Sequence, residues 1–295
     1  MSIWLDFMGA QIRYIDLPTY GVTRIAEAGR GKPQALLLMH GIGGHLEAYA
    51  KNVVALAEYF HVIAFDFVGH GLSEKKTDID YSIADYVEQL RELMDALDID
   101  RAHLSGESLG GVVAGTFAVR YPKRVLRAVL NTTGGIPVVT EKGRQDLANL
   151  AALSARSIGQ VPTFESVRAR MQWLMYEGNW HLLSAELIGA RLAIYASEGF
   201  QKVAPLIYTR LRKVTSGEAQ PDMIELEKVE CETLLLWTRH NPIHDVAAAE
   251  SALPRLPKGQ LYVMHTDAGH WPQYEDAKEF NHVMVEFLST GRVPA

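Results

Sequence analysis

The eight residues LSGESLGG at positions 104–111 decide the fold of this chain. They place Ser108 between two glycines, after a segment of strand character and before a stretch with helical periodicity. A sharp turn between strand and helix holds such a serine in a strained conformation, and the flanking glycines remove the steric conflict. The helix that follows directs its N-terminal N–H groups and its dipole towards the hydroxyl. We therefore predict that Ser108 is a nucleophile rather than an ordinary helix N-cap.

Strands and helices alternate on the N-terminal side of this turn. The sequence first alternates between polar and apolar residues, which indicates an antiparallel pair of strands at residues 11–16 and 22–27. Two uninterrupted apolar runs follow, at residues 35–39 and 62–65, and they are typical of strands buried on both faces. Helical patterns occupy residues 47–59, 85–97 and 109–121. Strand followed by helix, repeated, predicts an α/β fold with a mostly parallel sheet flanked by helices.

The alternation stops after a further strand at residues 125–130 and resumes about a hundred residues later. Residues 141–213 are amphipathic and helical, whereas 233–237 and 260–265 again resemble strands, before a terminal helix at 277–288. A helical insertion between two strands predicts a lid over the carboxyl edge of the sheet, where ligands bind in open α/β sheets. We divide the chain into a first core part at 1–135, a lid at 136–215 and a second core part at 216–295.

A glycine-rich loop at residues 36–44, LLLMHGIGG, ends another strand upstream. In a hydrolase, such a loop donates backbone N–H groups to a developing oxyanion, and the residue after the nucleophile supplies a further donor. We expect Gly41, Ile42 and Leu109 to form this oxyanion hole, with Gly43 beside the substrate. The alternative is a phosphate-binding loop, which the absence of a Walker lysine and of a spaced Gly-x-Gly-x-x-Gly disfavours.

The general base is expected in a loop after the last strand. Residues 266–271, TDAGHW, follow the strand-like residues 261–264, and a glycine allows a tight turn directly before His270. Among the eleven histidines, His270 has the most suitable context for a base. The alternative for this residue is a buried structural histidine.

The residue that orients the base should follow the strand at 233–237, where the loop reads TRHNPIHD at positions 238–245. The expected position holds Asn241, whose amide can orient His270 but cannot stabilise its positive charge as a carboxylate does. Asp245 substitutes for it if the loop folds back, and an acid at another strand end is a third possibility.

Composition excludes several classes of protein. The 295 residues are 48% hydrophobic and 22% charged, and the net charge of −6 lacks the basic excess of a nucleic-acid-binding protein. One cysteine, Cys231, excludes an internal disulfide and argues against a thiolate metal site. The N-terminus lacks the pattern of a signal peptide, and no apolar run is long enough to span a membrane. We expect a cytoplasmic protein with no membrane contact.

Several of these motifs together resemble an α/β-hydrolase, and within that superfamily the meta-cleavage-product hydrolases. The ending GHWPQYE at residues 269–275 is close to that family's, and the loop at 40–49 is similar to its oxyanion region. Arg191 in the lid matches an arginine that grips the substrate's carboxylate in the family. The resemblance implies an α/β-hydrolase fold, no metal or organic cofactor, and hydrolysis of a C–C bond in a 2-hydroxy-6-oxo-dienoate ring-fission product. Family members are commonly dimers or larger, which makes a homodimer the expectation.

The chain also departs from the family pattern. Glu107 stands before the nucleophile where the family usually has asparagine, and Asn241 replaces the usual aspartate. We expect Glu107 to contact the substrate and Trp271 to form a wall of its pocket. Two aromatic residues in the lid, Trp173 and Trp180, present further apolar surface to the cleft.

Three other functions stay open at this point. The same residues serve an esterase, a lactonase or an amide hydrolase, all of which need the same turn and oxyanion hole. A ligand-binding or sensor protein on a hydrolase scaffold, with catalysis weakened by Asn241, belongs to a different class. A cofactor-independent dioxygenase on this fold is a more distant alternative.

Overall fold

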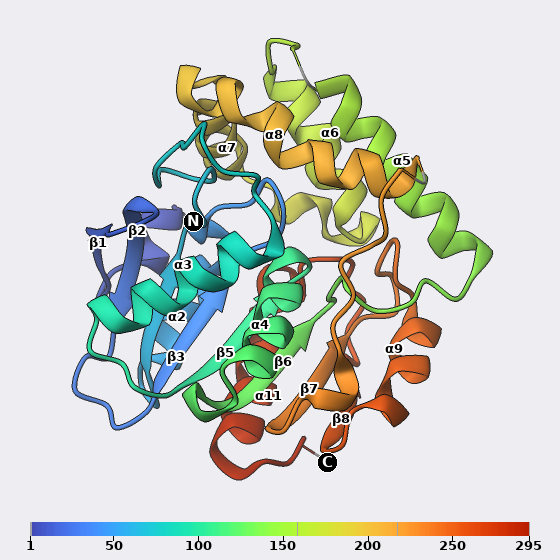
Figure 1. The fold of residues 1–295 in the computed structure, drawn as a ribbon. Helices are drawn as coiled ribbons and strands as arrows, with labels where there is room; N and C mark the ends of the chain where they lie inside the picture. The colour runs from blue at the N-terminus through green and yellow to red at the C-terminus, as the bar shows by residue number, and fades with distance from the viewer. Residues whose placement is uncertain (1, 158, 217, 295) are drawn as a thin grey trace.

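One mostly parallel sheet of eight strands runs through the protein (Figure 1). The computed structural model describes residues 2–157, 159–216 and 218–294. In spatial order the strands are β1 (Gln11–Leu17), β2 (Gly21–Ala28), β4 (His61–Phe65), β3 (Ala35–Met39), β5 (Ala102–Glu107), β6 (Val125–Asn131), β7 (Glu232–Trp237) and β8 (Gly259–Val263). The β1–β2 and β2–β4 pairs are antiparallel, and every later pair is parallel. The predicted fold class is therefore confirmed.

Helices cover both faces of the sheet (Figure 1). Helices α3 (Ile83–Ala96) and α4 (Leu109–Arg120) pack against each other on one face, and α2 (Ala50–Leu56) and α11 (Ala277–Thr290) pack together on the other. Of the short helices, α1 (Ile3–Asp6) packs against α2, α9 (Val246–Ala252) against β7 and β8, and α10 (Pro272–Glu275) against α2 and α11.

The helix expected at 47–59 is shorter than predicted. A 3₁₀ turn at Leu46–Tyr49 precedes α2, which ends at Leu56. The Leu46 N–H donates to Asp66 Oδ1, and the Tyr49 hydroxyl donates to the carbonyl of Met39. Because these tertiary bonds hold the turn at both ends, it does not adopt the pitch of an α-helix.

Four helices connect β6 to β7 and lie above the carboxyl edge of the sheet, at the top of Figure 1. They are α5 (Glu141–Ser157), α6 (Phe164–Leu174), α7 (Ala185–Ala196) and α8 (Glu198–Thr215), and we call them the lid. A 3₁₀ turn at Glu177–Leu182 separates α6 from α7. The lid thus faces the ends of β3, β5, β6, β7 and β8, from which the predicted site residues emerge.

Helix α4 approaches the sheet so closely that glycine is required at two positions. A Cβ atom on Gly106 would lie 2.0 Å from the carbonyl oxygen of Gly110, and one on Gly110 would lie 2.2 Å from that of Met39. Both atoms belong to the backbone and cannot move aside. The chain between these glycines turns sharply, and Ser108 adopts a left-handed φ of 54°. Such a conformation is costly for a residue with a side chain, so the surrounding packing must impose it.

A buried ion network fixes the loop between β3 and α2. The guanidinium of Arg24 donates two hydrogen bonds to Glu47, at 3.0 and 2.8 Å, and one to Asp66 at 2.7 Å. His45 lies 2.7 Å from the same Glu47 carboxylate through its Nδ1 atom. Burial raises the pKa of Glu47, but the hydrogen bond from His45 and the charge of Arg24 outweigh it and lower the pKa below its usual range.

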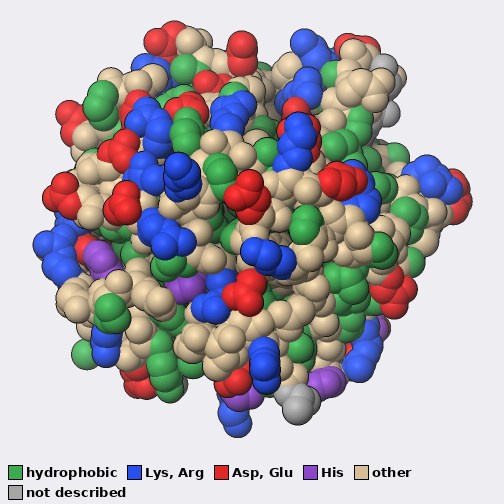
Figure 2. Space-filling view, turned by 60° about the horizontal axis from the view of Figure 1, so that its bottom comes forward, with side chains coloured by type: hydrophobic (Ala, Val, Ile, Leu, Met, Phe, Trp, Pro, Cys, Tyr) green, Lys and Arg blue, Asp and Glu red, His purple; other side chains and the backbone are tan. Residues whose placement is uncertain are grey.

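The surface in Figure 2 mixes both charges. Lysine and arginine side chains are interspersed with aspartate and glutamate over the face shown, so this face carries no broad field of one sign. No helix within the described ranges has the length together with the apolar character that a bilayer crossing requires.

Replacing Gly110 by alanine should destabilise the protein by about 3 kcal/mol, because the new methyl group overlaps a backbone carbonyl. The matched control is Gly189→Ala in α7, where no heavy atom of the described chain lies within 4 Å of the added Cβ. That change should raise stability by roughly 0.5–1 kcal/mol through helix propensity. Thermal unfolding of both variants measures these changes in stability. Equal shifts in Tm for Gly110→Ala and Gly189→Ala would contradict the close approach of α4 to the sheet.

Glu47→Gln should lower the free energy of unfolding at pH 7 by about 3 kcal/mol, since it breaks a buried ion pair. The native pKa of Glu47 is depressed, so its stabilisation is present above the pKa of the unfolded state and is lost as the pH falls. The difference between wild type and variant should therefore narrow below roughly pH 4. Urea unfolding at several pH values measures it, and the exposed Glu58→Gln serves as control. If the difference in free energy of unfolding between wild type and Glu47→Gln did not change with pH, the ion network around Glu47 would be contradicted.

Candidate active site

Ser108 occupies the turn between β5 and α4, as expected. Its own N–H donates to the carbonyl of Asn131 at the end of β6, and its carbonyl accepts the N–H groups of Gly111 and Val112. These bonds hold the backbone of the turn and leave the side chain to face a cavity at the edge of the sheet. The hydroxyl of Ser108 has no hydrogen-bond partner among the described residues in this state.

His270 lies in the loop after β8, with 4% of its surface exposed. Its N–H donates to the carbonyl of Leu174 in the lid at 2.7 Å, and its carbonyl accepts from the hydroxyl of Thr132 at 3.0 Å. Glu275 holds the same loop by accepting the N–H groups of Gly269 and Trp271. Burial raises the pKa of Glu275, and these hydrogen bonds oppose the rise. The imidazole is thus fixed from both the core and the lid.

The structure brings Asn241 rather than Asp245 to His270. The Nδ1 atom of His270 lies 2.7 Å from Asn241 Oδ1, while the Asn241 amide group donates to the carbonyl of His244. Asp245 points elsewhere: it caps α9 through the Ala248 N–H and accepts the hydroxyl of Thr140 at 2.7 Å. The alternative of Asp245 as the orienting residue is therefore wrong, because a helix N-cap and a threonine already use its two oxygens.

The predicted oxyanion loop needs one correction. The N–H groups of Ile42 and Leu109 make no hydrogen bond to any part of the chain that the structure describes, so both can serve an incoming oxygen. The Gly41 N–H, in contrast, donates to Glu107 Oε2 at 2.7 Å. Gly41 therefore does not belong to the set of free donors, since the neighbouring carboxylate already occupies it.

Arg191 is a buried cation, with 1% of its surface exposed. Its guanidinium carbon lies 4.7 Å from the centre of the Trp271 ring, and its Nε lies 3.3 Å from His45 Nε2. The Nη2 atom has no hydrogen-bond partner within the described residues. Burial and the charge of Arg191 lower the pKa of His45, which suits a neutral imidazole that accepts from Arg191 and donates to Glu47.

His45 and Glu47 were not predicted as site residues. The sequence offered only a weak signal for them, a histidine and a glutamate two residues apart in a glycine-rich loop, because their partner Arg24 is distant in sequence.

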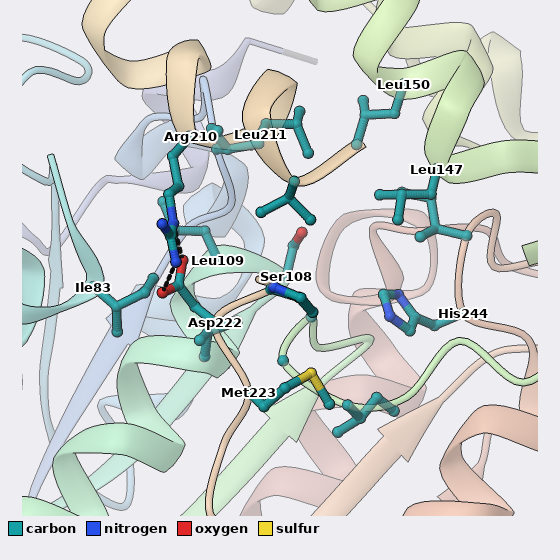
Figure 3. A pocket seen from close by; sticks show the side chains of 18 of the residues that line it. Ile83, Ser108, Leu109, Leu147, Leu150, Arg210, Leu211, Asp222, Met223 and His244 are labelled. Atoms are coloured by element: carbon teal, nitrogen blue, oxygen red, sulfur yellow. Dashed lines mark hydrogen bonds and ion pairs between the residues drawn. The ribbon is translucent and has the colours of Figure 1, made fainter. Parts of the chain in front are cut away.

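Ser108 and His270 line two cavities that differ in size and in charge. The larger, of about 550 Å³, is mainly apolar, and Figure 3 shows Leu147, Leu150 and Met223 among its walls and the Arg210–Asp222 ion pair at one side. The smaller has room for about 20 Å³ and is lined by the charged residues Glu107, Arg170 and Arg191 as well as by Trp271, and we call it the polar cavity. A molecule that spans the two cavities would pass the serine hydroxyl.

Three residues predicted to contact the substrate lie away from Ser108. Trp173 lines a separate cavity within the lid, and Trp180 is 42% exposed and donates to the carbonyl of Gln172. The carbonyl of Gly43 accepts the hydroxyl of Tyr195, so this glycine joins the loop to α7. The expectation is corrected for Trp173 and Trp180, because both lie in the lid away from the two cavities at Ser108. The contact predicted for Gly43 stays a prediction. Trp271, in contrast, forms a wall of the polar cavity.

Glu107 contacts His270 as well as the loop that carries Gly41. Its Oε1 atom lies 3.1 Å from His270 Nε2, and only 2% of the residue is exposed. The sequence predicted a substrate contact for Glu107, and the residue does line the polar cavity. Its contact with His270 was not predicted, because it depends on the position of a loop that comes 160 residues later in the chain.

Metal ligands are not assembled at this site. Within the described ranges, no group of three or more histidine, cysteine, aspartate or glutamate side chains is arranged to hold a metal ion. The chemistry that these residues can perform themselves is nucleophilic attack by a hydroxyl beside an imidazole, with two backbone donors for the developing oxyanion.

Known proteins share both this sequence pattern and this fold. A 2-hydroxy-6-oxo-2,4-heptadienoate hydrolase of Pseudomonas putida is 27% identical over 270 residues, which cover 90% of this chain and 92% of the relative. A 2-hydroxy-6-oxo-6-phenylhexa-2,4-dienoate hydrolase of Comamonas testosteroni is 26% identical, and the match covers 89% of each chain.

Solved structures agree with these relatives. The meta-cleavage product hydrolase of Pseudomonas fluorescens IP01 superimposes with a TM-score of 0.76 and 25% identity, over 97% of this chain and 100% of that one. A serine hydrolase of the polyaromatic hydrocarbon-degrading bacterium Cycloclasticus zankles superimposes with a TM-score of 0.78 and 25% identity, over 95% and 98% of the two chains. The alpha/beta hydrolase fold family matches residues 34–277, and the chain belongs to that family.

Proposed function

We propose that the protein is a serine-dependent hydrolase that cleaves a C–C bond in a 2-hydroxy-6-oxo-dienoate ring-fission product of aromatic catabolism. The observation that carries this proposal is the position of Ser108 and His270 between a buried arginine and an apolar chamber. Such a substrate has a carboxylate at one end, an acyl group at the other and the scissile bond between them. Relatives at 26–27% identity bear the names of hydrolases for compounds of this type.

Each end of the substrate has a matching part of the site. Arg191 has an unpartnered, buried N–H group that can donate to a carboxylate, an arrangement in which a charge-assisted bond is strong. Trp271 forms the wall beside it. The polar cavity has room for about one water molecule at about 20 Å³, so a carboxylate enters only after side chains that line it rotate.

The apolar chamber argues for a bulky acyl group. Its volume of about 550 Å³ falls within the range of small-molecule binding pockets, and leucine, isoleucine, valine and methionine side chains line most of it. A phenyl or a branched alkyl substituent buries more apolar surface there than a methyl group does, and burial of such surface stabilises the complex. We therefore expect preference for substrates with a large apolar acyl group.

The reaction begins with ketonisation of the dienol substrate, in which the enol O–H proton is lost and His270 assists the delivery of a proton to the carbon chain. The Ser108 hydroxyl, or a water molecule activated beside it, then attacks the distal carbonyl carbon and gives its proton to His270 Nε2. The Ile42 and Leu109 N–H groups stabilise the oxyanion. When this intermediate collapses, the C–C bond breaks, its electron pair stays with the dienoate fragment, and that fragment accepts the proton from His270. Water releases the carboxylic acid if an acyl-enzyme has formed.

One observation favours a second function, hydrolysis of a neutral ester, lactone or amide. Glu107 lines the polar cavity together with Arg191 and brings a negative charge to the place where a substrate carboxylate would bind. A neutral carbonyl compound avoids that repulsion and uses the same serine, histidine and backbone donors.

Replacing Ser108 by alanine should lower kcat for ring-fission products at least about 10³-fold, because the nucleophile is lost. The matched control is Ser105→Ala in the same motif, whose buried hydroxyl has no partner among the described residues and should be dispensable. The decay of the dienolate absorbance over a panel of acyl groups measures turnover. Slow decay with the wild type throughout the panel, together with rapid ester hydrolysis, would favour the second function instead.

Arg191→Met should raise KM for a substrate that carries a carboxylate by about tenfold or more, since a charge-assisted hydrogen bond contributes roughly 1.5–3 kcal/mol. The same change should leave kcat/KM for a neutral p-nitrophenyl ester nearly unaltered. Arg210→Met, which removes a cation from the apolar chamber, is the control and should not distinguish the two substrates. Equal losses for both substrates in Arg191→Met would show that Arg191 acts in packing alone.

A further inference from the structure

The carboxylate of Glu107 lies on the side of His270 from which a serine proton must arrive. Oε1 is 3.1 Å from His270 Nε2, and Oε2 accepts the Gly41 N–H at 2.7 Å. Both residues are buried, with 2% and 4% of their surfaces exposed. On the other side of the ring, Nδ1 faces the neutral amide of Asn241.

The hydrogen bonds around the ring determine where its protons lie. The Asn241 amide N–H₂ donates to the carbonyl of His244, which leaves the amide oxygen facing Nδ1. An amide oxygen only accepts, so Nδ1 must carry a hydrogen. Nε2 then faces a carboxylate oxygen, and two acceptors do not approach to 3.1 Å in a buried site without a proton between them.

We propose that Glu107 is the charge partner of His270, supplying at Nε2 the negative charge that the neutral Asn241 cannot supply at Nδ1. Glu107 is thus a positioning residue, which acts through His270, and the resting pair is an imidazolium beside a carboxylate. The Gly41 N–H favours this placement of the proton on His270, because its hydrogen bond stabilises the ionised form of Glu107. The inference rests on the role of base proposed for His270.

This arrangement gives the reaction an order. In the resting state the Nε2–H bond points to Glu107, and His270 is an acid. After this proton passes to the substrate, Nε2 has a free lone pair and can accept the proton of Ser108 as its oxygen attacks. The imidazolium that forms is again stabilised by Glu107, just as a carboxylate at Nδ1 stabilises it in an ordinary triad. Proton donation therefore precedes nucleophilic attack.

Several other titratable groups surround the pair. Burial, together with the charge of His270, lowers the pKa of His244 to about 4, and burial lowers that of His40 to about 4 as well. Burial and the charge of Glu107 raise the pKa of Tyr49 well above its usual value. Arg191 and Arg170 line the same polar cavity as cations. Glu275, whose pKa is raised by burial, accepts the backbone N–H groups of Gly269 and Trp271 on either side of His270.

Four proteins test the proposal: the wild type, Glu107→Gln, Asn241→Asp and the double variant. The readout is the rate at which a fluorophosphonate modifies Ser108, measured from pH 5 to pH 9. Glu107→Gln should slow the reaction about tenfold or more at its plateau and move the acidic limb to lower pH. A glutamine oxygen can still accept the Gly41 N–H, so Tm should change little.

The sign of the Asn241→Asp effect in the two backgrounds decides whether Glu107 acts through its charge or only through its structure. In the wild-type background this change adds a second carboxylate to the same ring, so it should slow modification at pH 7 and move the acidic limb to higher pH. In the Glu107→Gln background it should restore the rate, because one carboxylate is again present. A structural role for Glu107 predicts instead the same Asn241→Asp effect in both backgrounds, and that result would overturn the proposal.

Glu275→Gln is the control for loss of a buried carboxylate near the base. Glu275 bonds backbone N–H groups rather than the ring, so this variant should lower Tm and leave the acidic limb in place.

Nitrogen-15 NMR of the histidine side chains tests the resting state without turnover or labelling. Both ring nitrogens of His270 should carry protons at pH 7 in the wild type, and only Nδ1 should in Glu107→Gln. An unprotonated Nε2 in the wild type at pH 7 would overturn the inference. Because neither measurement uses a ring-fission product, inactivity towards those compounds would refute the proposed function and leave the role of Glu107 intact.

Discussion

The close approach of helix α4 to the sheet is the constraint on which the site depends. Only a hydrogen fits on Gly106 and Gly110, and the backbone contact between α4 and β3 forces Ser108 into its left-handed conformation. The same contact sets the N–H of Leu109 beside the loop that carries Ile42. The positions of the Ser108 side chain and of the Leu109 N–H are therefore consequences of one packing distance. The energy that holds them in place comes from the burial of α4 and of the strands beneath it.

Buried charges arrange the polar half of the site. A continuous row of contacts runs from Arg24 through Glu47 and His45 to Arg191, each member paired with the next. Isolated charges are costly in such surroundings, whereas paired ones are tolerated and well oriented. Glu107 and His270 form a second pair on the other side of the polar cavity. Asn241 fits this arrangement. Position 241 holds no carboxylate, and His270 contacts instead the carboxylate of Glu107, the residue directly before Ser108.

The sequence was sufficient for the fold and for the position of Ser108 between a strand and a helix. Uninterrupted apolar runs predicted the parallel strands, the turn at Ser108 was recognisable from its glycines, and the resemblance to the α/β-hydrolases is confirmed by the family match. Prediction was weaker where a role depends on distant partners. Asp245 had the right charge but caps a helix, and Trp173 packs inside the lid. The contacts of His45 and Glu107 join segments far apart in sequence, and no local pattern reveals them.

Helix α7 is attached to the core near both of its ends. Glu186 accepts the Ser2 hydroxyl and the Ile3 N–H, and the Tyr195 hydroxyl donates to the carbonyl of Gly43. Arg191 therefore moves with the core, although its helix belongs to the lid. The apolar chamber, in contrast, takes Leu147 and Leu150 from α5 and Leu211 from α8. Leu150 borders both cavities, whereas Leu147 and Leu211 line the apolar chamber alone. Substitutions at these two positions can reshape that chamber without touching the cavity that holds Arg191, so the two cavities can diverge separately there during evolution.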